Sequence, residues 1–343
     1  MPVVADILRA HPEAQIDWVV EEAFVSLVAL VHGVHRVIPC ALRRWRKYPL
    51  ALKTLAESRA FKRALRAQTY DLVIDCQGLL KTAWLASRAR GKVVGLANRT
   101  DGAGYEWPVR FFYDVRVPIP RRTHVVERSR QLVEAALALV AGQPVDRHAA
   151  SVSTPSTPSA PAALSGGTET VDKLLTLPEF AIDTRAASRA MAELALNLPL
   201  PYVVLIHATS RADKQWPDAA WNELGQALVR RGASIVLPWG SEAEREVSER
   251  LARDFGQAAI VPPKLSLPAV VGLLDGAAAC VGVDTGLIHI AAALGRPTIE
   301  LYNLPTAWRT GGYWSPRIVN LGLGGGPPAV SEVKRALTGF GLL

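Results

Sequence analysis

A loop in the second half of the chain combines residue types that can hold a phosphate group. Residues 207–217 read His-Ala-Thr-Ser-Arg-Ala-Asp-Lys-Gln-Trp-Pro, so the hydroxyls of Thr209 and Ser210 and the ammonium of Lys214 are close together in sequence. Such a group can stabilise the negative charge of a departing phosphate without a metal ion. Ser, Thr and Lys are common in loops, so an ordinary surface loop is the alternative interpretation.

A second loop, residues 281–289, reads Val-Gly-Val-Asp-Thr-Gly-Leu-Ile-His. An apolar strand is expected to end just before Asp284, and Asp284 and Thr285 are residue types that cap a helix start. Gly286 lets a ligand approach the backbone closely, and the free N–H groups of a helix start suit a diphosphate. His289, one turn into that helix, could donate a hydrogen bond to a phosphate oxygen. A capped helix with an internally bonded histidine is the alternative.

A third loop, residues 238–244, reads Pro-Trp-Gly-Ser-Glu-Ala-Glu. Its last residue, Glu244, could place a carboxylate on the ribose hydroxyls of a nucleotide. Acidic residues are also stabilised at the start of a helix by the helix dipole. Taken alone, Glu244 therefore fits a solvated helix start better than a ribose contact.

Each of these loops follows an apolar run that predicts a buried strand. The runs are short and rich in β-branched residues: Tyr202–His207, Ser234–Pro238 and Cys280–Val283. Stretches with the apolar spacing of helices separate them, at residues 219–231, 243–255, 267–275 and 287–294. Alternating strands and helices predict parallel sheets, in which ligands bind beyond the carboxyl ends of the strands.

The first half of the chain shows the same alternation. Strands are expected at Ile16–Val20 and Asp71–Asp75, and an amphipathic helix at Arg59–Gln68. A length of 343 residues favours two domains. Between the halves, residues 147–170 are nearly all Ala, Ser, Thr, Pro and Gly, and this composition buries too little apolar surface to fold.

We therefore expect an α/β protein with two domains and a cleft between them. The expected parts are a first domain at 1–146, a linker or insertion at 147–175, a second domain at 176–325, and a C-terminal helix at 326–343 that can pack back on the first domain.

The positive charge of the chain is concentrated in one segment. The net charge is +8, and residues 36–66 hold ten basic residues and one acidic residue, Glu57, so this segment alone carries +9. Its core, Arg43–Lys47, reads Arg-Arg-Trp-Arg-Lys, which favours binding to a phosphate, a nucleic acid or an anionic membrane surface. A solvated helix face is the alternative.

The composition argues against several other classes of protein. Hydrophobic residues make up 49% of the chain and charged residues 20%, which excludes a wholly disordered protein. The three scattered cysteines, Cys40, Cys76 and Cys280, exclude a disulfide framework or a Cys-rich zinc site and indicate a reducing compartment. The longest apolar run, Ala23–Val34, is shorter than the roughly 20 residues needed to cross a bilayer. The start, Met1–Asp6, has no secretion-signal pattern, and no residue cluster has metal-ligand spacing, so we expect no cofactor.

Four motifs of the second half, in their order, resemble the bacterial heptosyltransferases of glycosyltransferase family nine: Lys214-x-Trp-Pro, Pro238-Trp-Gly, Pro263-Lys-Leu-Ser-Leu and Val283-Asp-Thr-Gly-x-x-His. Motifs of the first half are similar to the members that add the first heptose to the inner core of lipopolysaccharide: Asp17-Trp-Val-Val-Glu-Glu, Arg36-Val-Ile-Pro, Arg43-Arg-Trp-Arg-Lys, Asp75-Cys-Gln-Gly-Leu and His124-Val-Val-Glu-Arg. The resemblance runs from Met1 to about residue 320, without the linker. It implies the GT-B architecture, in which two Rossmann-like domains face each other across a cleft.

The resemblance also implies the substrates and the site residues. The implied donor is ADP-heptose, the implied acceptor is the Kdo sugar of Kdo-lipid A, and the transfer is inverting and metal-independent. Carried over position by position, it implies that the diphosphate and heptose are held by Thr209, Ser210 and Lys214, with Lys214 stabilising the leaving group. It places the ribose at Glu244 and the adenine at Leu265, and completes the donor site with Asp284, Thr285, Gly286 and His289.

The basic segment gains a specific role from the same resemblance. Arg43, Arg46 and Lys47 are expected to meet the anionic acceptor. We accordingly expect a cytoplasmic protein that associates peripherally with the anionic inner face of the inner membrane.

The family pattern begins with a strand and a loop that ends in Gly-Asp, and this aspartate is the proposed general base. Here the sequence opens at Met-Pro-Val-Val-Ala-Asp, which resembles the helix after that loop, and Asp6 matches a later helical position. We therefore expect the chain as written to bind the ADP-sugar but to transfer heptose poorly. If transfer is complete, Asp75 and Glu21 are the first candidates for the base.

Three alternatives remain open at this point. One is a core heptosyltransferase with another acceptor, which the Arg-Arg-Trp-Arg-Lys core disfavours. Another is a chain that binds a nucleotide sugar with little turnover. The third is a nucleic-acid-binding protein, which would carry basic residues on several elements with aromatic platforms between them. The confinement of the charge to one segment argues against it.

Overall fold

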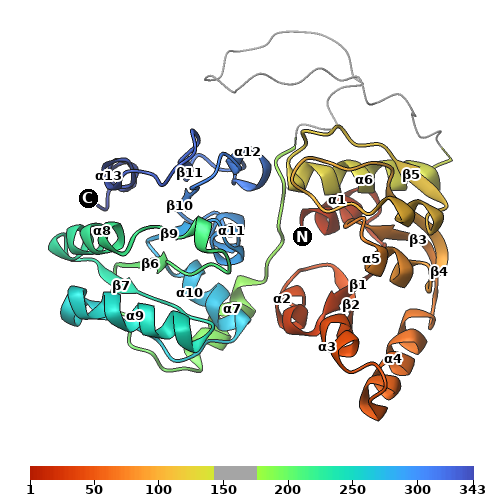
Figure 1. The fold of residues 1–343 in the computed structure, drawn as a ribbon, viewed down its shortest axis with the longest axis horizontal. Coiled ribbons are helices and arrows are strands. Elements are labelled where there is room, and N and C mark those ends of the chain that lie inside the picture. Colours follow the sequence, from red (N-terminus) through yellow and green to blue (C-terminus); the bar gives the residue numbers. More distant parts are fainter. Residues whose placement is uncertain (143–175) are drawn as a thin grey trace, which may run out of the picture. The chain divides into compact units, whose positions relative to one another are not determined.

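The computed structural model describes residues 1–142 and 176–343 (Figure 1). The linker expected at 147–175 lies outside the described residues. The described chain groups into two compact units, one of Met1, 15–44 and 180–343, and one of 2–14 with the described residues of 45–179. The domain boundaries expected from the sequence stay predictions.

Residues 180–343 form a six-stranded parallel sheet with strand order β11-β10-β9-β6-β7-β8. Its strands are β6 (Tyr202–Ile206), β7 (Ser234–Val236), β8 (Ala259–Ile260), β9 (Ala279–Val283), β10 (Thr298–Leu301) and β11 (Ile318–Leu321). The helices of this region are α7 (Thr184–Ala192), α8 (Asp218–Arg230), α9 (Glu242–Phe255), α10 (Leu267–Asp275), α11 (Gly286–Ala293), α12 (Ala307–Thr310) and α13 (Val330–Gly339).

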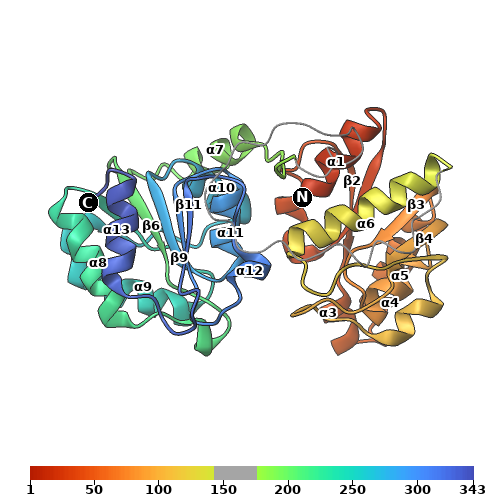
Figure 2. The same cartoon turned by 90° about the horizontal axis from the view of Figure 1, so that it is seen from above.

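Helices cover both faces of this sheet. Along β6, Val203 and Leu205 pack against residues of α8, α9 and α13, while Val204 and Ile206 pack against residues of α10 and α11. Figure 2 shows these two groups of helices on opposite sides of the strands. Burial of both faces explains why the strands are continuous apolar runs rather than alternating ones.

The strand order brings two loops of the sequence together. The chain runs outward from β6 through β7 to β8, and then returns to the centre at β9 before running to β10 and β11. The neighbours β6 and β9 therefore lie where the strand order reverses, which is the position at which α/β sheets bind ligands. The loops that follow these two strands are the Lys214 loop and the Asp284 loop.

The C-terminal helix packs within its own half of the chain. Val333 and Leu337 of α13 are fully buried in the cluster that contains α8 and α9 residues. The apolar face of α13 therefore contacts the sheet that precedes it, and packing of the C-terminal segment on the first domain stays a prediction.

The first half contains two further parallel sheets, each described by itself. In one, β1 (Ile16–Glu21) pairs with β2 (Val34–Cys40), and in the other β4 (Arg90–Leu96) lies between β3 (Thr69–Asp75) and β5 (Val115–Val117). The helices of this half are α1 (Pro2–Ala10), α2 (Val25–Val28), α3 (Leu42–Lys47), α4 (Leu52–Leu65), α5 (Leu80–Ala86) and α6 (Val125–Val140). On the three-stranded sheet, Leu132 and Ala136 of α6 pack against Val94 and Leu96 of β4.

Most elements expected from the sequence are present, with one clear error. The five expected strands coincide with β1, β3, β6, β7 and β9 to within two residues at either end, and Leu267–Asp275 is α10. The helix expected at Arg59–Gln68 is wrong in its bounds, because α4 begins at Leu52 and ends at Leu65. The prediction missed the first two turns because Leu52 and Ala56 are exposed and the one buried residue there, Thr54, is polar. In the described residues, no helix combines the length and apolarity needed to cross a membrane.

Candidate functional site

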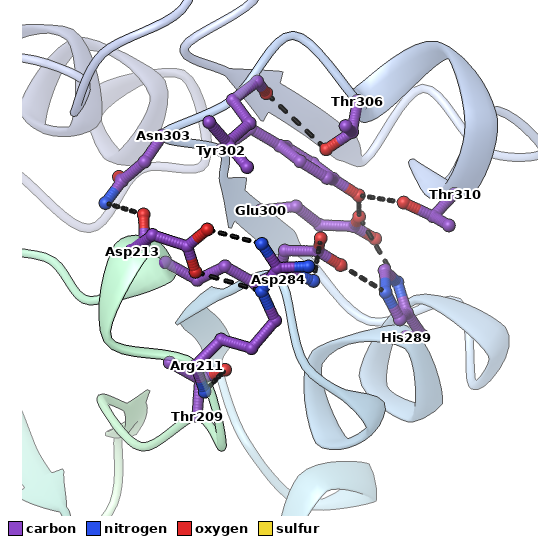
Figure 3. A network of polar contacts seen from close by, with 12 residues as sticks. Thr209, Arg211, Asp213, Asp284, His289, Glu300, Tyr302, Asn303, Thr306 and Thr310 are labelled. Atoms are coloured by element: carbon purple, nitrogen blue, oxygen red, sulfur yellow. Dashed lines mark hydrogen bonds and ion pairs between the residues drawn. The ribbon is translucent and has the colours of Figure 1, made fainter. Parts of the chain in front are cut away.

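The Lys214 loop and the Asp284 loop meet through an ion pair. Lys214 is the last residue of a short 3₁₀ helix, η5 (Ala212–Lys214), and its Nζ lies 2.6 Å from Oδ2 of Asp284. Figure 3 shows Asp284 with His289 beside it. Asn303, which follows β10, holds this turn by donating from Nδ2 to the carbonyl oxygens of Asp213 and Gln215, at 3.2 and 2.7 Å. Three loops at one edge of the sheet thus fix the position of the Lys214 ammonium.

Asp284 lies between two basic side chains. Its side chain is 7% exposed, and Oδ1 lies 3.1 Å from Nε2 of His289 while Oδ2 bonds Lys214. Burial would raise the pKa of this carboxyl, but the hydrogen bonds from His289 and Lys214 outweigh burial and lower the pKa to about 2. Asp284 therefore stays ionised and holds both basic groups in place.

His289 lies between two acidic side chains. Its Nδ1 is 3.4 Å from Oε2 of Glu300, a fully buried residue of β10. Glu300 also accepts hydrogen bonds from the hydroxyl of Tyr302 at 2.7 Å and from the backbone N–H of Gly312 at 3.3 Å. Burial lowers the pKa of His289, but the hydrogen bond to Asp284 and the negative charge of nearby Glu300 dominate and raise it to about 9. The imidazole is therefore a cation near neutral pH.

The sequence analysis did not identify Glu300, Tyr302 and Thr310 as part of this network. The Tyr302 hydroxyl lies 3.4 Å from Oγ1 of Thr310 in addition to its bond to Glu300, and burial raises the pKa of Tyr302 well above its usual range. A glutamate inside an otherwise apolar strand, Thr-Ile-Glu-Leu, was the available signal. Buried carboxylates need partners, so such a residue marks a polar cluster.

The start of α11 is left without a side-chain cap. Thr285 is the N-cap residue but its side chain makes no capping hydrogen bond, so the expectation that Asp284 and Thr285 cap this helix is wrong. The ion pair with Lys214 and the bond to His289 engage Asp284 instead. Gly286 is exposed, and a Cβ atom added there would meet nothing within 4 Å, so the space beside this residue is open. An uncapped helix start of this kind is suited to an anion.

The remaining residues of the Lys214 loop are only weakly engaged. The Thr209 hydroxyl accepts from the Arg211 N–H at 3.5 Å, and Ser210 is exposed. Arg211 forms an exposed ion pair with Asp213. The Thr209 and Ser210 hydroxyls therefore have room for a further partner near the Lys214 ammonium.

Glu244 acts as a helix-capping residue in the structure. Its Oε2 accepts from the N–H groups of Gly240 at 2.7 Å and Ser241 at 3.2 Å, and the Ser241 hydroxyl accepts in return from the Glu244 N–H at 3.3 Å. This reciprocal arrangement is a capping box at the start of α9. Leu265, the residue expected at the adenine, is half-buried against the apolar cluster of α10 and α11.

The basic residues expected at the acceptor all lie on α3. Arg43, Arg46 and Lys47 are exposed, and the Lys47 Nζ lies 5.3 Å from the ring centre of Tyr48. Arg44, between them, differs because it forms a bidentate pair with Glu22 at 3.0 and 2.8 Å. The helix thus presents positive charge to solvent at the three positions that the sequence singled out.

Comparison with known proteins identifies the family. The model of glycosyltransferase family 9 (heptosyltransferase) matches residues 58–336. Lipopolysaccharide heptosyltransferase 1 of Pseudomonas aeruginosa is 38% identical over 338 residues, which are 98% of this chain and 83% of that protein. The chain belongs to glycosyltransferase family 9, the heptosyltransferases.

Solved structures of a family 9 heptosyltransferase share the fold. The structure of Escherichia coli heptosyltransferase WaaC with ADP aligns with a TM-score of 0.76 and 33% identity over 99% of this chain and 94% of that one. The WaaC structure with ADP-2-deoxy-2-fluoro heptose aligns with a TM-score of 0.71, 34% identity and coverages of 99% and 93%. The GT-B class predicted from the sequence is therefore confirmed, and this family 9 chain is a glycosyltransferase.

Two acidic residues of the first half were named as candidate bases, and both have partners in this heptosyltransferase. Asp75, at the end of β3, is 5% exposed, and its Oδ2 accepts from the hydroxyls of Tyr113 at 2.7 Å and Thr82 at 2.9 Å. Glu21 Oε1 accepts from the Arg43 N–H at 3.1 Å. Across residues 1–142 and 176–343, no group of three His, Cys, Asp or Glu side chains could hold a metal ion.

Proposed function

We propose that this family 9 chain transfers heptose from ADP-heptose to the Kdo sugar of Kdo-lipid A in the synthesis of the lipopolysaccharide inner core. The observation that carries the proposal is the cationic group of Lys214 and His289 beside the uncapped start of α11. Asp284 and Glu300 offset the charges of Lys214 and His289, so the groups that fit a diphosphate are the N–H groups at the uncapped helix start together with the Lys214 ammonium beside them. The P. aeruginosa relative is named lipopolysaccharide heptosyltransferase 1, and the E. coli WaaC structure is of a complex with ADP. Both support the substrate class.

At the donor site, we propose that Asp284 positions its neighbours. These neighbours, and not Asp284 itself, contact the diphosphate. A carboxylate would repel a diphosphate, but Asp284 is already shared between Lys214 and His289. Lys214, the α11 N–H groups at Thr285 and Gly286, and the hydroxyls of Thr209 and Ser210 then face the phosphates. His289 adds positive charge from one turn into the helix.

The same groups account for stabilisation of the leaving group. When the bond between the anomeric carbon and the phosphate oxygen breaks, negative charge develops on the ADP diphosphate. The Lys214 ammonium is held by Asp284 before substrate binds, so no reorganisation is needed as that charge appears. A Kdo hydroxyl that attacks the anomeric carbon from the opposite face of the sugar forms the new glycosidic bond with inversion, and its proton passes to solvent as ADP leaves.

Glu244 and Leu265 are proposed at the nucleoside. Only Oε2 of Glu244 is used by the N–H groups of Gly240 and Ser241, which leaves Oε1 for a ribose hydroxyl. Leu265 precedes the N-cap of α10 and offers an apolar surface for the adenine ring.

Arg43, Arg46 and Lys47 are proposed to bind the anionic acceptor and to attract the inner face of the inner membrane. Exposed basic side chains gain about 1 kcal/mol each near an anionic lipid surface. Nucleic acid is not proposed, because the positive charge is confined to one segment.

The direct test is a transfer assay with ADP-heptose and Kdo-lipid A, run beside calorimetric measurement of ADP binding. Heptosylated Kdo-lipid A with little effect of a chelator supports the proposal. ADP binding with no heptose transfer to this acceptor would leave two other functions, a nucleotide-sugar-binding chain with little turnover or a heptosyltransferase with another acceptor. A second assay on acceptors that already carry heptose separates those two.

A further inference from the structure

Two leucines beside the basic helix are exposed to an unusual degree. Leu50 and Leu52 are 86% and 85% exposed, the highest values for large hydrophobic side chains among the described residues. Tyr48, in the same turn between α3 and α4, is 53% exposed. Two exposed leucines, two and four positions after a tyrosine, form an apolar surface whose exposure to water does not stabilise the protein.

This turn is held outward by its neighbours. Trp45 of α3 donates its indole N–H to Oε2 of Glu57 at 2.9 Å, and its ring packs edge-on against Phe61 of α4 at 5.7 Å. The buried face of α4 consists of Thr54, Phe61 and Leu65. The helical spacing places Leu52 on the opposite side from Phe61, so the leucine cannot join the core without rotation of the whole helix.

Positive charge surrounds the leucines. The bond to Trp45 engages half-buried Glu57, the one acidic residue of segment 36–66. Arg59 and Arg63 fall on the same helical side as Leu52, because they follow it at seven and eleven positions. The exposed basic residues of the two helices that the turn joins are Arg43, Arg46, Lys47, Lys53, Arg59, Lys62 and Arg63.

We propose that the α3–α4 turn inserts Leu50 and Leu52 into the interfacial layer of an anionic bilayer while the surrounding basic side chains bind lipid headgroups. An apolar tip within a lysine- and arginine-rich rim is the composition of interfacial membrane anchors. The lysines argue against a protein partner, because lysine is depleted from the centres of protein interfaces. The inference rests on the proposed function in one respect, since an acceptor with a lipid anchor is reached at a membrane surface.

Vesicle co-sedimentation tests this proposal with a matched pair of variants. The test variant is Leu50→Ser with Leu52→Ser, and the control is Leu323→Ser, a 63% exposed leucine in a glycine-rich turn of the second half. Vesicles of phosphatidylcholine alone and of phosphatidylcholine with phosphatidylglycerol are compared at low and high salt. We expect the wild type to prefer the anionic vesicles and to keep part of its binding at high salt.

The double variant should bind anionic vesicles at least about tenfold more weakly and lose all binding at high salt, because only the charge attraction remains. The control should behave as the wild type. Equal partition of the double variant and the wild type at both salt concentrations would overturn the proposal in favour of purely electrostatic attraction. An equal loss in the control, or no vesicle binding by the wild type, would also overturn it.

A transfer assay separates this inference from the proposed function. With a deacylated, water-dispersed acceptor and ADP-heptose, the double variant should retain the wild-type rate, since Leu50 and Leu52 bind neither substrate. If the wild type transfers no heptose but the vesicle difference is found, the proposed function fails and the membrane contact stands. Loss of transfer to the deacylated acceptor in the double variant alone would place the leucines in the acceptor site instead.

Discussion

In the second half of the chain the charged side chains after β6 and β9 bind one another. In the first half, three basic residues of α3 and all the basic residues of α4 face solvent. Asp284, His289 and Glu300 are buried or half-buried and alternate in sign along one network. Arg43, Arg46 and Lys47 project from α3, and no hydrogen bond or ion pair within the described ranges is formed by the side chains of Arg43 and Arg46.

The two regions correspond to the two kinds of anion site that we propose for this chain. A preorganised network fixes donor groups for one small ligand, and each member depends on the others. An exposed basic surface attracts an anionic surface of variable shape, and its members act nearly independently. Substitutions in the first kind of site should therefore change both folding and binding, while substitutions in the second should change binding alone.

The largest effect is expected from Asp284→Ala and Lys214→Ala. Removing the carboxylate leaves Lys214 and His289 without their shared partner, and breaking a buried ion pair costs about 3 kcal/mol of unfolding free energy. Lys214→Ala should weaken ADP binding by about tenfold to 100-fold, the effect of a lost charge-assisted hydrogen bond. Denaturant titration and calorimetry measure the two quantities.

Asp213→Ala is the matched control for this pair of variants. Asp213 lies in the same turn as Lys214, but its ion pair with Arg211 is exposed, so stability and ADP affinity should change little. If Asp284→Ala and Lys214→Ala behaved like this control, the network would not be the donor site.

Charge reversal on α3 should have the next largest effect, and it should weaken the binding of the acceptor but not of the donor. With Arg43, Arg46 and Lys47 all changed to Glu, we expect the KM for Kdo-lipid A to rise at least about tenfold at low salt. The unfolding free energy and ADP affinity should stay close to those of the wild type, because these side chains are exposed. Arg253→Glu, an exposed change on α9, serves as the control. Equal damage to both substrates would instead mean that α3 supports the fold.

The pH dependence of ADP binding should follow the titration of His289. The folded pKa of His289 is about 9, above its ordinary value of 6.5, so its proton stabilises the fold below pH 6.5 and this contribution is lost as the pH rises through 9. ADP affinity should fall over the same range. Asp284 acts in the opposite sense, since its contribution is present above pH 3.8 and lost as the pH falls toward 2.

Glu300→Gln tests the cause of the His289 shift. The amide keeps the shape of the side chain but removes the charge beside Nδ1, so the His289 pKa should move toward 6.5 and the loss of ADP affinity should move to lower pH with it. Tyr302→Phe removes only a hydrogen bond to Glu300 and should shift both less. NMR titration of His289 follows the pKa directly, and an unchanged value in Glu300→Gln would rule out Glu300 as its positioning residue.

The smallest effect is expected at Glu244. Glu244→Gln keeps an oxygen for the N–H groups of Gly240 and Ser241, so stability should fall by only a few tenths of a kcal/mol, whereas Glu244→Ala should lose about 1 kcal/mol with the capping box. ADP affinity should fall several-fold in both variants if Oε1 binds the ribose. If the ADP affinity of Glu244→Gln equals that of the wild type and only the destabilised Glu244→Ala variant binds ADP more weakly, Glu244 is a helix cap and not a ribose contact.

From the sequence, three of the six strands of the second half were predicted, β6, β7 and β9, because they are continuous apolar runs, whereas β8, β10 and β11 were missed. A run such as Tyr202–Ile206 has no exposed face and so stands out as continuously apolar. The motif residues on the loops after these strands were found for the same reason, since the ends of the strands were visible. The exposed start of α4 was missed because nothing in Leu52–Ala56 marks a buried side.

The contacts among the polar residues of the second half follow from the tertiary structure and could not be predicted from the sequence. Lys214 and Asp284 are 70 positions apart, and their loops come together because β6 and β9 are neighbours in the sheet while β7 and β8 lie outside them. Strand order depends on how whole βαβ units pack, and periodicity within one element carries no record of it. The same packing brings Glu300 beneath His289 and turns Asp284 from a helix cap into the shared partner of two cations. The sequence therefore determined which residue types could bind a diphosphate. The fold determined which residues each of them contacts, because contacts depend on strand order, and those contacts set the charge of His289 and Asp284.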